Sequence, residues 1–401
     1  MIKRTDFPIL TRKIKGRTLV YFDNAATAQK PRAVIAATVA YYKKYNANVH
    51  RSLNPLADEA TKRYEAARDT IAAAILARRE EVIFTRGATE GINLVARTWG
   101  AENLKPNDRI VLSLAEHHAN IVPWLQLQAK IGFKLDYIPV KDSGALDIQA
   151  ARRLLSRPRV RLLALTQASN VLGVVNPLGG LIRLAKSKKI ITLIDAAQSA
   201  AHRPINVRSL GCDFLVLSGH KIWGPTGIGI LYGRRELLEA MPPFLGGGDM
   251  ISAVYPDHFL TNSLPYKFEA GTPNIAGAIG LGAAVAYINQ VSWPEIKRRE
   301  RALTAYFLKK IKTLKFVQIL GTAQPKLPVF SLLIKGIHPH DAADLLGEEG
   351  IILRAGHHCA QPLHERYGVA ASLRASLSFY NTEAEIDFFV KKLQELYQAF
   401  Q

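Results

Sequence analysis

Short apolar segments with the composition of β-strands recur along the chain, and helical patterns lie between them. We expect strands at residues 82–84, 109–114, 134–140, 161–165, 190–195 and 214–217. The stretch 181–189 is one of the intervening helices that we expect. Strands that alternate with helices in this way are typical of a mainly parallel, doubly wound sheet. The alternation therefore places the chain in the α/β class.

The pattern changes near residue 291, where we expect a charged helix that runs to residue 312. Further strands with intervening helices follow to the end of the chain. We therefore predict a large domain of residues 16–290 and a smaller α+β domain of residues 1–15 and 291–401. The 401 residues, of which 48% are hydrophobic, are enough for two cores of this kind.

Side chains that carry chemistry follow two of the predicted strands. One strand ends in Asp195, and Lys221 follows another within a turn of small residues. Ligands of open α/β sheets bind at the carboxyl ends of the strands. A lysine held there can lose its hydration and bond to a cofactor aldehyde, and a carboxylate can keep a pyridine nitrogen protonated. Taken alone, such a lysine is more often an exposed loop residue, and such an aspartate is equally often a helix N-cap.

A turn that opens a helix at Gly87 and Thr89 offers a binding place for a phosphate. Its free backbone N–H groups, its hydroxyl and the positive end of the helix all suit an anion. Many turns between strands and helices contain glycine and threonine, so this signal is weak by itself. Together with Ser218, His220 and Lys221 it predicts a phosphate-binding cup.

Six stretches of the sequence carry a family resemblance. They are residues 21–26, 86–95, 116–124, 169–173, 268–273 and 354–362. Together they resemble the class V aminotransferase group of fold-type I pyridoxal phosphate enzymes, and within that group the Suf-type (group II) cysteine desulfurases. They occur in the order of the family, and the resemblance covers nearly the whole chain.

The resemblance implies that pyridoxal 5'-phosphate is the cofactor. Lys221 would bond to it and later move the Cα proton of the substrate, and His117 would lie over the pyridine ring and assist proton transfer. The other contacts implied are Asp195 to the ring nitrogen, Gln198 to the phenolic oxygen, and Thr89, Ser218 and His220 to the phosphate.

The resemblance also implies a homodimer and a binding site for the substrate carboxylate. Thr272 would reach the cofactor phosphate of the second subunit. Asn170 and Arg374 would bind the substrate carboxylate, with Arg354 in the same substrate site. An arginine can hold a carboxylate through two parallel hydrogen bonds, although a single arginine more commonly forms a surface ion pair.

Cys359 separates a desulfurase from the other activities of the family. It follows Gly356 in a loop, where nearby basic residues such as Arg354 favour the nucleophilic thiolate. One alternative is a His-His-Cys metal site, but no second cluster supplies the missing ligands. Another is a structural cysteine in the core, which is the role that we expect for Cys212.

The resemblance implies that L-cysteine becomes L-alanine and that the sulfur remains as a persulfide on Cys359. A small acceptor protein of the iron–sulfur cluster assembly system would then collect the sulfur. The alternatives are a selenocysteine lyase, which would use L-selenocysteine, or another enzyme of the class V aminotransferase type.

The chain carries 53 Lys and Arg against 33 Asp and Glu, a formal net charge of +20. Such an excess attracts phosphate backbones and acidic surfaces. The basic residues are spread along the chain without a recognition motif, so we do not expect a nucleic-acid-binding function. Two cysteines, no signal-peptide pattern and no apolar run of membrane-spanning length lead us to expect a cytoplasmic enzyme away from membranes.

Overall fold

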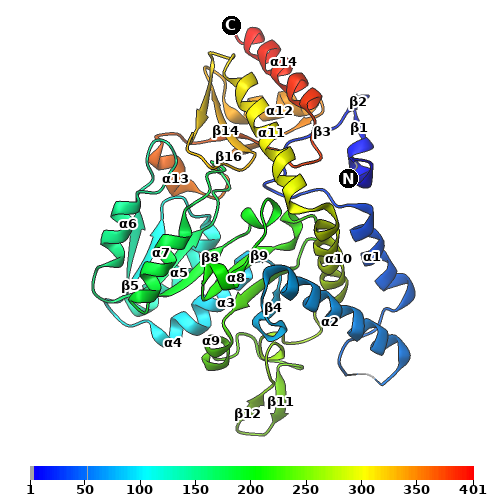
Figure 1. Ribbon diagram of the computed structural model, residues 1–401, viewed down its shortest axis with the longest axis vertical. Helices are drawn as coiled ribbons and strands as arrows, with labels where there is room; N and C mark the ends of the chain where they lie inside the picture. The colour runs from blue at the N-terminus through cyan, green and yellow to red at the C-terminus, as the bar shows by residue number, and fades with distance from the viewer. Residues whose placement is uncertain (1–3, 52) are drawn as a thin grey trace.

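The computed structural model describes residues 4–51 and 53–401, and a large sheet forms its centre (Figure 1). The seven strands of the sheet follow the order β4-β10-β9-β8-β7-β5-β6. Their bounds are β4 (Val82–Thr85), β5 (Arg109–Ser113), β6 (Lys134–Ile138), β7 (Val160–Thr166), β8 (Ile191–Asp195), β9 (Phe214–Ser218) and β10 (Gly229–Gly233). The neighbouring strands β9 and β8, β8 and β7, β7 and β5, and β5 and β6 pair in parallel. Strand β10 pairs antiparallel with β9 and with β4. The predicted α/β class is confirmed.

Helices cover both faces of this sheet, as the alternation of its side chains requires. In β9, Leu215 and Leu217 belong to one hydrophobic core, and Phe214 and Val216 belong to another. The larger helices of this part are α1 (Arg32–Lys44), α2 (Pro55–Ile75), α3 (Ala88–Val95), α5 (Val122–Ile131), α6 (Ile148–Leu155), α7 (Leu178–Ser187) and α10 (Ile275–Val291). Helix α10 is apolar all round, and it is largely buried because α1 and α2 pack against it.

A second, antiparallel sheet is built from the last part of the chain. Its order is β13-β14-β17-β16. Its strands are β13 (Val317–Leu320), β14 (Val329–Ile334), β16 (Arg354–Gly356) and β17 (Ser372–Ser376), and its helices are α11 (Trp293–Ile311), α12 (Pro339–Glu348) and α14 (Glu383–Ala399). The charged helix that we expected after residue 291 is α11.

The N-terminal part of the chain lies against this second sheet. Strand β3 (Val20–Tyr21) pairs in parallel with β15 (Ile351–Ile352). Val20 and Phe22 pack in the same core as Leu303 of α11. The domain boundaries at residues 15 and 290 stay a prediction, and residues 1–3 of the predicted small domain lie outside the described residues.

The remaining strands and α-helices are short. They are β1 (Lys13–Ile14), β2 (Arg17–Thr18), α4 (Ala101–Asn103), α8 (Val207–Leu210), α9 (Arg235–Ala240), β11 (Ile251–Val254), β12 (Phe259–Thr261) and α13 (Gln361–Arg366). The hairpin of β11 and β12 projects from the lower end of the molecule in Figure 1. Among the described helices, none is alone long and apolar enough to cross a membrane, although the bent pair α10 and α11 passes on length and composition.

Candidate active site

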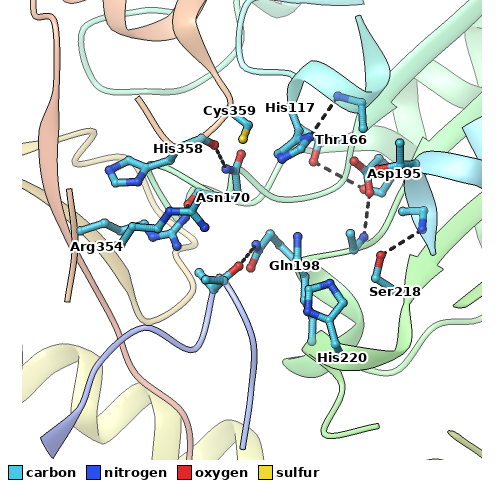
Figure 2. Close-up of a pocket in the computed structure, with 18 residues that line it drawn as sticks. His117, Thr166, Asn170, Asp195, Gln198, Ser218, His220, Arg354, His358 and Cys359 are labelled. Atoms are coloured by element: carbon cyan, nitrogen blue, oxygen red, sulfur yellow. Dashed lines mark hydrogen bonds between the residues drawn. The ribbon is translucent and has the colours of Figure 1, made fainter. Parts of the chain in front are cut away.

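A pocket of about 190 Å³ lies at the carboxyl ends of β7, β8 and β9, next to the second sheet (Figure 2). It is the place where the alternation of strands and helices led us to expect a ligand. Of the residues predicted for the site, those that line it are Thr89, His117, Asn170, Asp195, Gln198, Ser218, His220, Lys221, Arg354, Cys359 and Arg374. The structure thus brings together side chains from segments far apart in the sequence.

The turn after β9 places Lys221 in the pocket. Ser218 ends the strand, and the turn Gly219–Lys221 follows at once. A Cβ atom at Gly219 would lie 2.9 Å from the carbonyl oxygen of Ile228, so only glycine allows this close approach. Ser218 Oγ accepts a hydrogen bond from the backbone N–H of Ala88, at 2.9 Å, which joins this turn to the first turn of α3.

Lys221 and Asp195 influence each other across the pocket. Burial lowers the pKa of Lys221, and the charge of Asp195 offsets only part of this change. Burial likewise raises the pKa of Asp195, although the charge of Lys221 lowers it. Asp195 Oδ1 accepts from the backbone N–H of Ala197 at 2.8 Å. The pocket therefore holds an amine that gives up its proton readily and a carboxylate that favours a cationic partner.

His117 lines the pocket, and its imidazole ring is neutral. Burial, followed by the charge of Lys221, lowers the pKa of His117 to about 3. Its Nδ1 accepts from the backbone N–H of Ala119 at 3.0 Å (Figure 2). The proton of the neutral ring is therefore on Nε2. Gln198 is fixed as well, because its Nε2 donates to the carbonyl oxygen of Ala25 at 2.8 Å.

Two arginines face each other on neighbouring strands beside the pocket. Arg354 of β16 is directly opposite Arg374 of β17 in the antiparallel register. Arg374 is 1% exposed, and it donates to Asp23 Oδ1 at 2.9 Å and to the carbonyl oxygen of Asn170 at 3.0 Å. Its Nε is buried without a hydrogen-bond partner among the described residues. Like charges directly opposite are destabilising, so this place favours an anion such as a carboxylate.

The two cysteines differ in their surroundings. Cys359 is partly exposed and lines the pocket. Cys212 is 2% exposed, and burial raises its pKa to about 12. Cys212 is therefore the buried core cysteine that we expected, whereas the thiol of Cys359 is accessible from the pocket. No three His, Cys, Asp or Glu side chains in the described part of the chain are grouped as a metal site.

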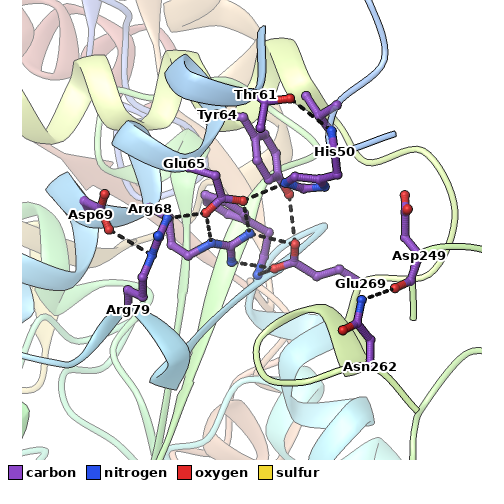
Figure 3. A network of polar contacts seen from close by, with 12 residues as sticks. His50, Thr61, Tyr64, Glu65, Arg68, Asp69, Arg79, Asp249, Asn262 and Glu269 are labelled. Carbon is purple, nitrogen blue, oxygen red and sulfur yellow. Dashed lines mark hydrogen bonds and ion pairs between the residues drawn. The ribbon is translucent and has the colours of Figure 1, made fainter. Parts of the chain in front are cut away.

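Thr272 lies away from this pocket. It lines a second hollow of about 460 Å³, together with Phe84 and Glu269. Glu269 is held in a buried polar network, in which it accepts from both terminal nitrogens of Arg68, at 2.7 and 2.8 Å, and from the hydroxyl of Tyr64 (Figure 3). The segment before Thr272 is therefore anchored firmly to α2, and its predicted contact with a second subunit stays a prediction.

Glu116, which precedes His117, was not among the site residues predicted from the sequence. The side chain of Glu116 accepts from Ser113 Oγ at 2.5 Å and from Asn120 Nδ2 at 2.8 Å, so it ties the end of β5 to the loop that carries His117. Burial raises the pKa of Glu116 to about 7. Asp23, the partner of Arg374, was not predicted from the sequence either. Both residues lie inside stretches that carried the family resemblance, but nothing local to them indicates their partners.

Residues 20–389 match the family described as aminotransferase class-V. A probable cysteine desulfurase of Xylella fastidiosa is 47% identical over 390 residues, which cover 97% of this chain and 94% of that protein. The apo structure of a cysteine desulfurase from Thermococcus onnurineus has a TM-score of 0.94 and 38% identity, covering 99% of this chain and 97% of the other. The cysteine desulfurase CsdA from Escherichia coli has a TM-score of 0.91 and 42% identity, covering 98% of both chains. The chain therefore belongs to the class-V aminotransferase family.

Proposed function

We propose that this protein is a pyridoxal phosphate-dependent cysteine desulfurase, which converts L-cysteine to L-alanine and leaves the sulfur as a persulfide on Cys359. The observation that carries the proposal is that Cys359 lines the same pocket as Lys221, Asp195 and the two facing arginines. An aminotransferase would use the lysine and the carboxylate but has no use for a thiol at this position. The desulfurase names of the relatives agree with this assignment.

The residues of the pocket fit the cofactor. Burial disfavours the charge of Asp195 and raises its pKa, and a protonated pyridine nitrogen would supply the cationic neighbour that stabilises the carboxylate. Thr89 lies in the first turn of α3, and Ser218 at the end of β9 is joined to that turn through Ala88, so both are placed where a phosphate is favoured. When bound, pyridoxal phosphate supplies an electron sink that weakens the Cα–H bond and then the C–S bond of the substrate.

The protein itself orients the substrate and moves protons. Arg354 and Arg374 hold the carboxylate, which fixes the side of the pocket toward which the substrate sulfur points. The lowered pKa of Lys221 favours the neutral amine, which takes the Cα proton as a general base. His117 keeps its proton on Nε2, and this N–H is available to the substrate inside the pocket.

Cys359 performs the sulfur transfer. Its thiolate attacks the substrate sulfur, so that an S–S bond forms while the C–S bond breaks. The electron pair of the broken bond stays with the carbon fragment, which takes up protons and leaves as L-alanine. The sulfur atom remains bound to Cys359 as a persulfide. L-cysteine and the enzyme thiol are thereby converted to L-alanine and the enzyme persulfide, with no further reactant.

Steady-state assays of product formation test this function. The purified protein, reconstituted with pyridoxal phosphate, is incubated with L-cysteine and a reducing thiol, and alanine and sulfide are measured in the same samples. We expect the two products in equal amounts. Pyruvate with sulfide, or an amino-group transfer to a keto acid without sulfide, would point to a different enzyme of the family.

The finer assignment is to the Suf-type (group II) desulfurases, which deliver their sulfur to a small acceptor protein of iron–sulfur cluster assembly. The motifs around His117 and Cys359 support this assignment. A free thiol needs a reducing compartment, which supports a cytoplasmic location. Comparison of L-cysteine with L-selenocysteine as substrates tests the alternative of a selenocysteine lyase.

A homodimer is supported by apolar side chains on the surface. Ile35, Val39 and Tyr42 form an exposed stripe along α1, and Phe259 and Leu260 are exposed on the hairpin of β11 and β12. A second subunit would cover such surfaces, and it would give Thr272 a cofactor to contact. The molar mass in solution, measured by light scattering, tests the dimer.

A further inference from the structure

The backbone that carries Cys359 has an uncommon conformation. His358 and Cys359 are consecutive residues with φ angles of 51° and 56°. L-residues disfavour this left-handed region because Cβ crowds the following carbonyl oxygen, although histidine is found there more often than most. Such a conformation persists only where the surroundings fix it. The contacts of these two residues therefore determine where the thiol lies.

The backbone of the loop is held by the large sheet. Asn170 Nδ2 donates to the carbonyl oxygen of His358 at 2.7 Å, as Figure 2 shows. The backbone N–H of His118 donates to the carbonyl oxygen of Cys359, also at 2.7 Å. Both donors lie in loops that follow strands of the large sheet, at the edge where the pocket forms.

The ring of His358 is held by the second sheet. Its Nε2 lies 3.1 Å from both the carbonyl oxygen and Oγ of Ser372 in β17. Because a carbonyl oxygen only accepts, Nε2 of His358 carries the proton. His364 Nδ1 likewise donates to the carbonyl oxygen of Ala360 at 3.1 Å, so its Nε2 accepts from Ser372 Oγ at 3.0 Å. One continuous chain of hydrogen bonds thus runs through both rings.

The ring of His358 has no other hydrogen bond among the described residues. His358 is 4% exposed, and its Nδ1 is buried without a partner there. Burial lowers the pKa of His358 to about 2, so the ring is neutral at ordinary pH. A buried nitrogen without a partner costs free energy, and the bond to Ser372 offsets this cost only while the loop keeps its conformation. The ring therefore couples the shape of the loop to β17.

We propose that His358 is a positioning residue for sulfur transfer: its ring, fixed on Ser372, holds Cys359 in the left-handed conformation that directs the thiol into the pocket. The inference rests on the proposed function, since it concerns the step in which Cys359 takes the sulfur. Without the ring, the loop relaxes toward ordinary backbone angles, and the thiol loses its alignment with the substrate sulfur.

Two matched variants test the proposal. His358→Asn removes the ring but tolerates a positive φ and keeps the backbone carbonyl that Asn170 contacts. His357→Asn makes the same change at the exposed neighbouring position and is the control. The first readout is the rate at which iodoacetamide alkylates Cys359 in the native holoenzyme, located by peptide mass spectrometry. Cys212 is buried and should not be alkylated in this assay. We expect a severalfold faster reaction in His358→Asn and an unchanged rate in His357→Asn.

The second readout is the kinetics of alanine formation. Misplacing a reacting group by about 1 Å lowers a rate by up to about 100-fold, so we expect kcat of His358→Asn to fall by about 10-fold or more. The KM for L-cysteine and the change in cofactor absorbance on adding L-cysteine should be retained, because substrate and cofactor are held by other residues. Ser372→Ala, which removes the hydroxyl between the two rings and leaves the carbonyl, should show smaller changes in the same direction.

Equal alkylation rates and equal kcat in His358→Asn and His357→Asn would overturn the proposal, even if His358→Asn melts at a lower temperature. His358 would then be a core histidine and nothing more. If His358→Asn does not fold, Ser372→Ala decides, and wild-type values for both readouts overturn the proposal. A wild-type enzyme that forms no alanine from L-cysteine would contradict the proposed function instead, while the alkylation rates would still report whether His358 anchors Cys359.

Discussion

Arg354 and Arg374 show how pairing between strands creates a site that neither residue makes alone. Each is an ordinary arginine in its own segment, but the register of β16 and β17 sets them opposite each other. Asp23 neutralises only part of their charge, through Arg374. The remaining positive charge is available to an anion, and the substrate carboxylate fits this requirement.

Arg354→Gln should therefore weaken substrate binding. Loss of a hydrogen bond to a charged group costs about 1.5–3 kcal/mol, so we expect the KM for L-cysteine to rise by roughly 10- to 100-fold with a smaller change in kcat. Arg298→Gln removes an exposed arginine from α11 and should leave KM unchanged. A KM for Arg354→Gln within error of the wild type would remove this arginine from the carboxylate site.

The role of Lys221 should be visible in the state of the cofactor rather than in KM. The purified wild type should be yellow, and borohydride should fix the cofactor covalently to Lys221. Lys221→Ala should lose turnover entirely and keep some cofactor, because the phosphate contacts remain in place. Absorbance spectra and a mass measurement after borohydride treatment follow both effects. A colourless wild type that cannot be reconstituted would contradict the cofactor assignment.

At the scale of elements, the buried network of α2 joins β4 to the segment that carries Thr272 (Figure 3). Arg68 has a side chain with no exposed surface and is paired with both Glu65 and Glu269. Removing one member of such a group leaves the other charges buried and unpaired, which is strongly destabilising. We infer that this network fixes the position of Thr272 relative to the large sheet.

The network should make stability depend on pH. Burial raises the pKa of Glu65, but the hydrogen bond to His50 and the charges of Arg68 and Arg79 outweigh it and lower the pKa from its ordinary 4.5 to about 2. A carboxylate with a lowered folded-state pKa stabilises the protein above pH 4.5, and this contribution is lost as the pH falls toward 2. It is on the order of 3 kcal/mol.

Urea unfolding between pH 6 and pH 3 measures this contribution. The free energy of unfolding of the wild type should fall more steeply with decreasing pH than that of Glu65→Gln, which cannot titrate at this position. Glu102→Gln, at an exposed position on α4, should follow the wild type. Parallel pH profiles of the wild type and Glu65→Gln would show that Glu65 is not held as the structure indicates.

Much of the fold and pocket could be predicted from the sequence, because strands such as 190–195 and 214–217 carry their own local pattern. The first ends in Asp195, and the second leads into Ser218 and Lys221. Strand β10 was missed, since nothing in Gly229–Gly233 tells a strand that runs against its neighbours from a buried loop. The facing of Arg354 and Arg374, and the fixing of His358 on Ser372, depend on pairing between distant segments. The local sequence of a segment does not indicate which residues of a distant segment will lie opposite it.

At the scale of the whole molecule, the net charge of +20 bears on partners. An exposed basic stripe runs along α11 and the residue after it. It consists of Lys297, Arg301, Lys309 and Lys312, and none of these four forms an ion pair among the described residues. Opposite charges on a partner would speed the encounter. We therefore expect an acidic sulfur acceptor.

Acceptor-stimulated turnover should consequently decrease from low to moderate salt. The Debye length is about 10 Å at 0.1 M salt, so steering between the two proteins is screened over this range. Basal turnover without the acceptor should stay level, because L-cysteine reacts inside the pocket. Alanine formation with and without acceptor measures both. Stimulation that does not change with salt would exclude charge steering and leave the desulfurase assignment intact.

In the proposed reaction Cys359 takes the sulfur, and one turnover of the holoenzyme without reductant or acceptor shows whether it does. Alanine is quantified in the same sample in which mass spectrometry locates the added sulfur. We predict one sulfur atom on Cys359 for each alanine, none on Cys212, and an unchanged result for Cys212→Ser. Cys359→Ser should keep its colour, bind L-cysteine and form no alanine by sulfur transfer. Full alanine formation in Cys359→Ser, or the added sulfur on Cys212, would show that Cys359 does not take the sulfur.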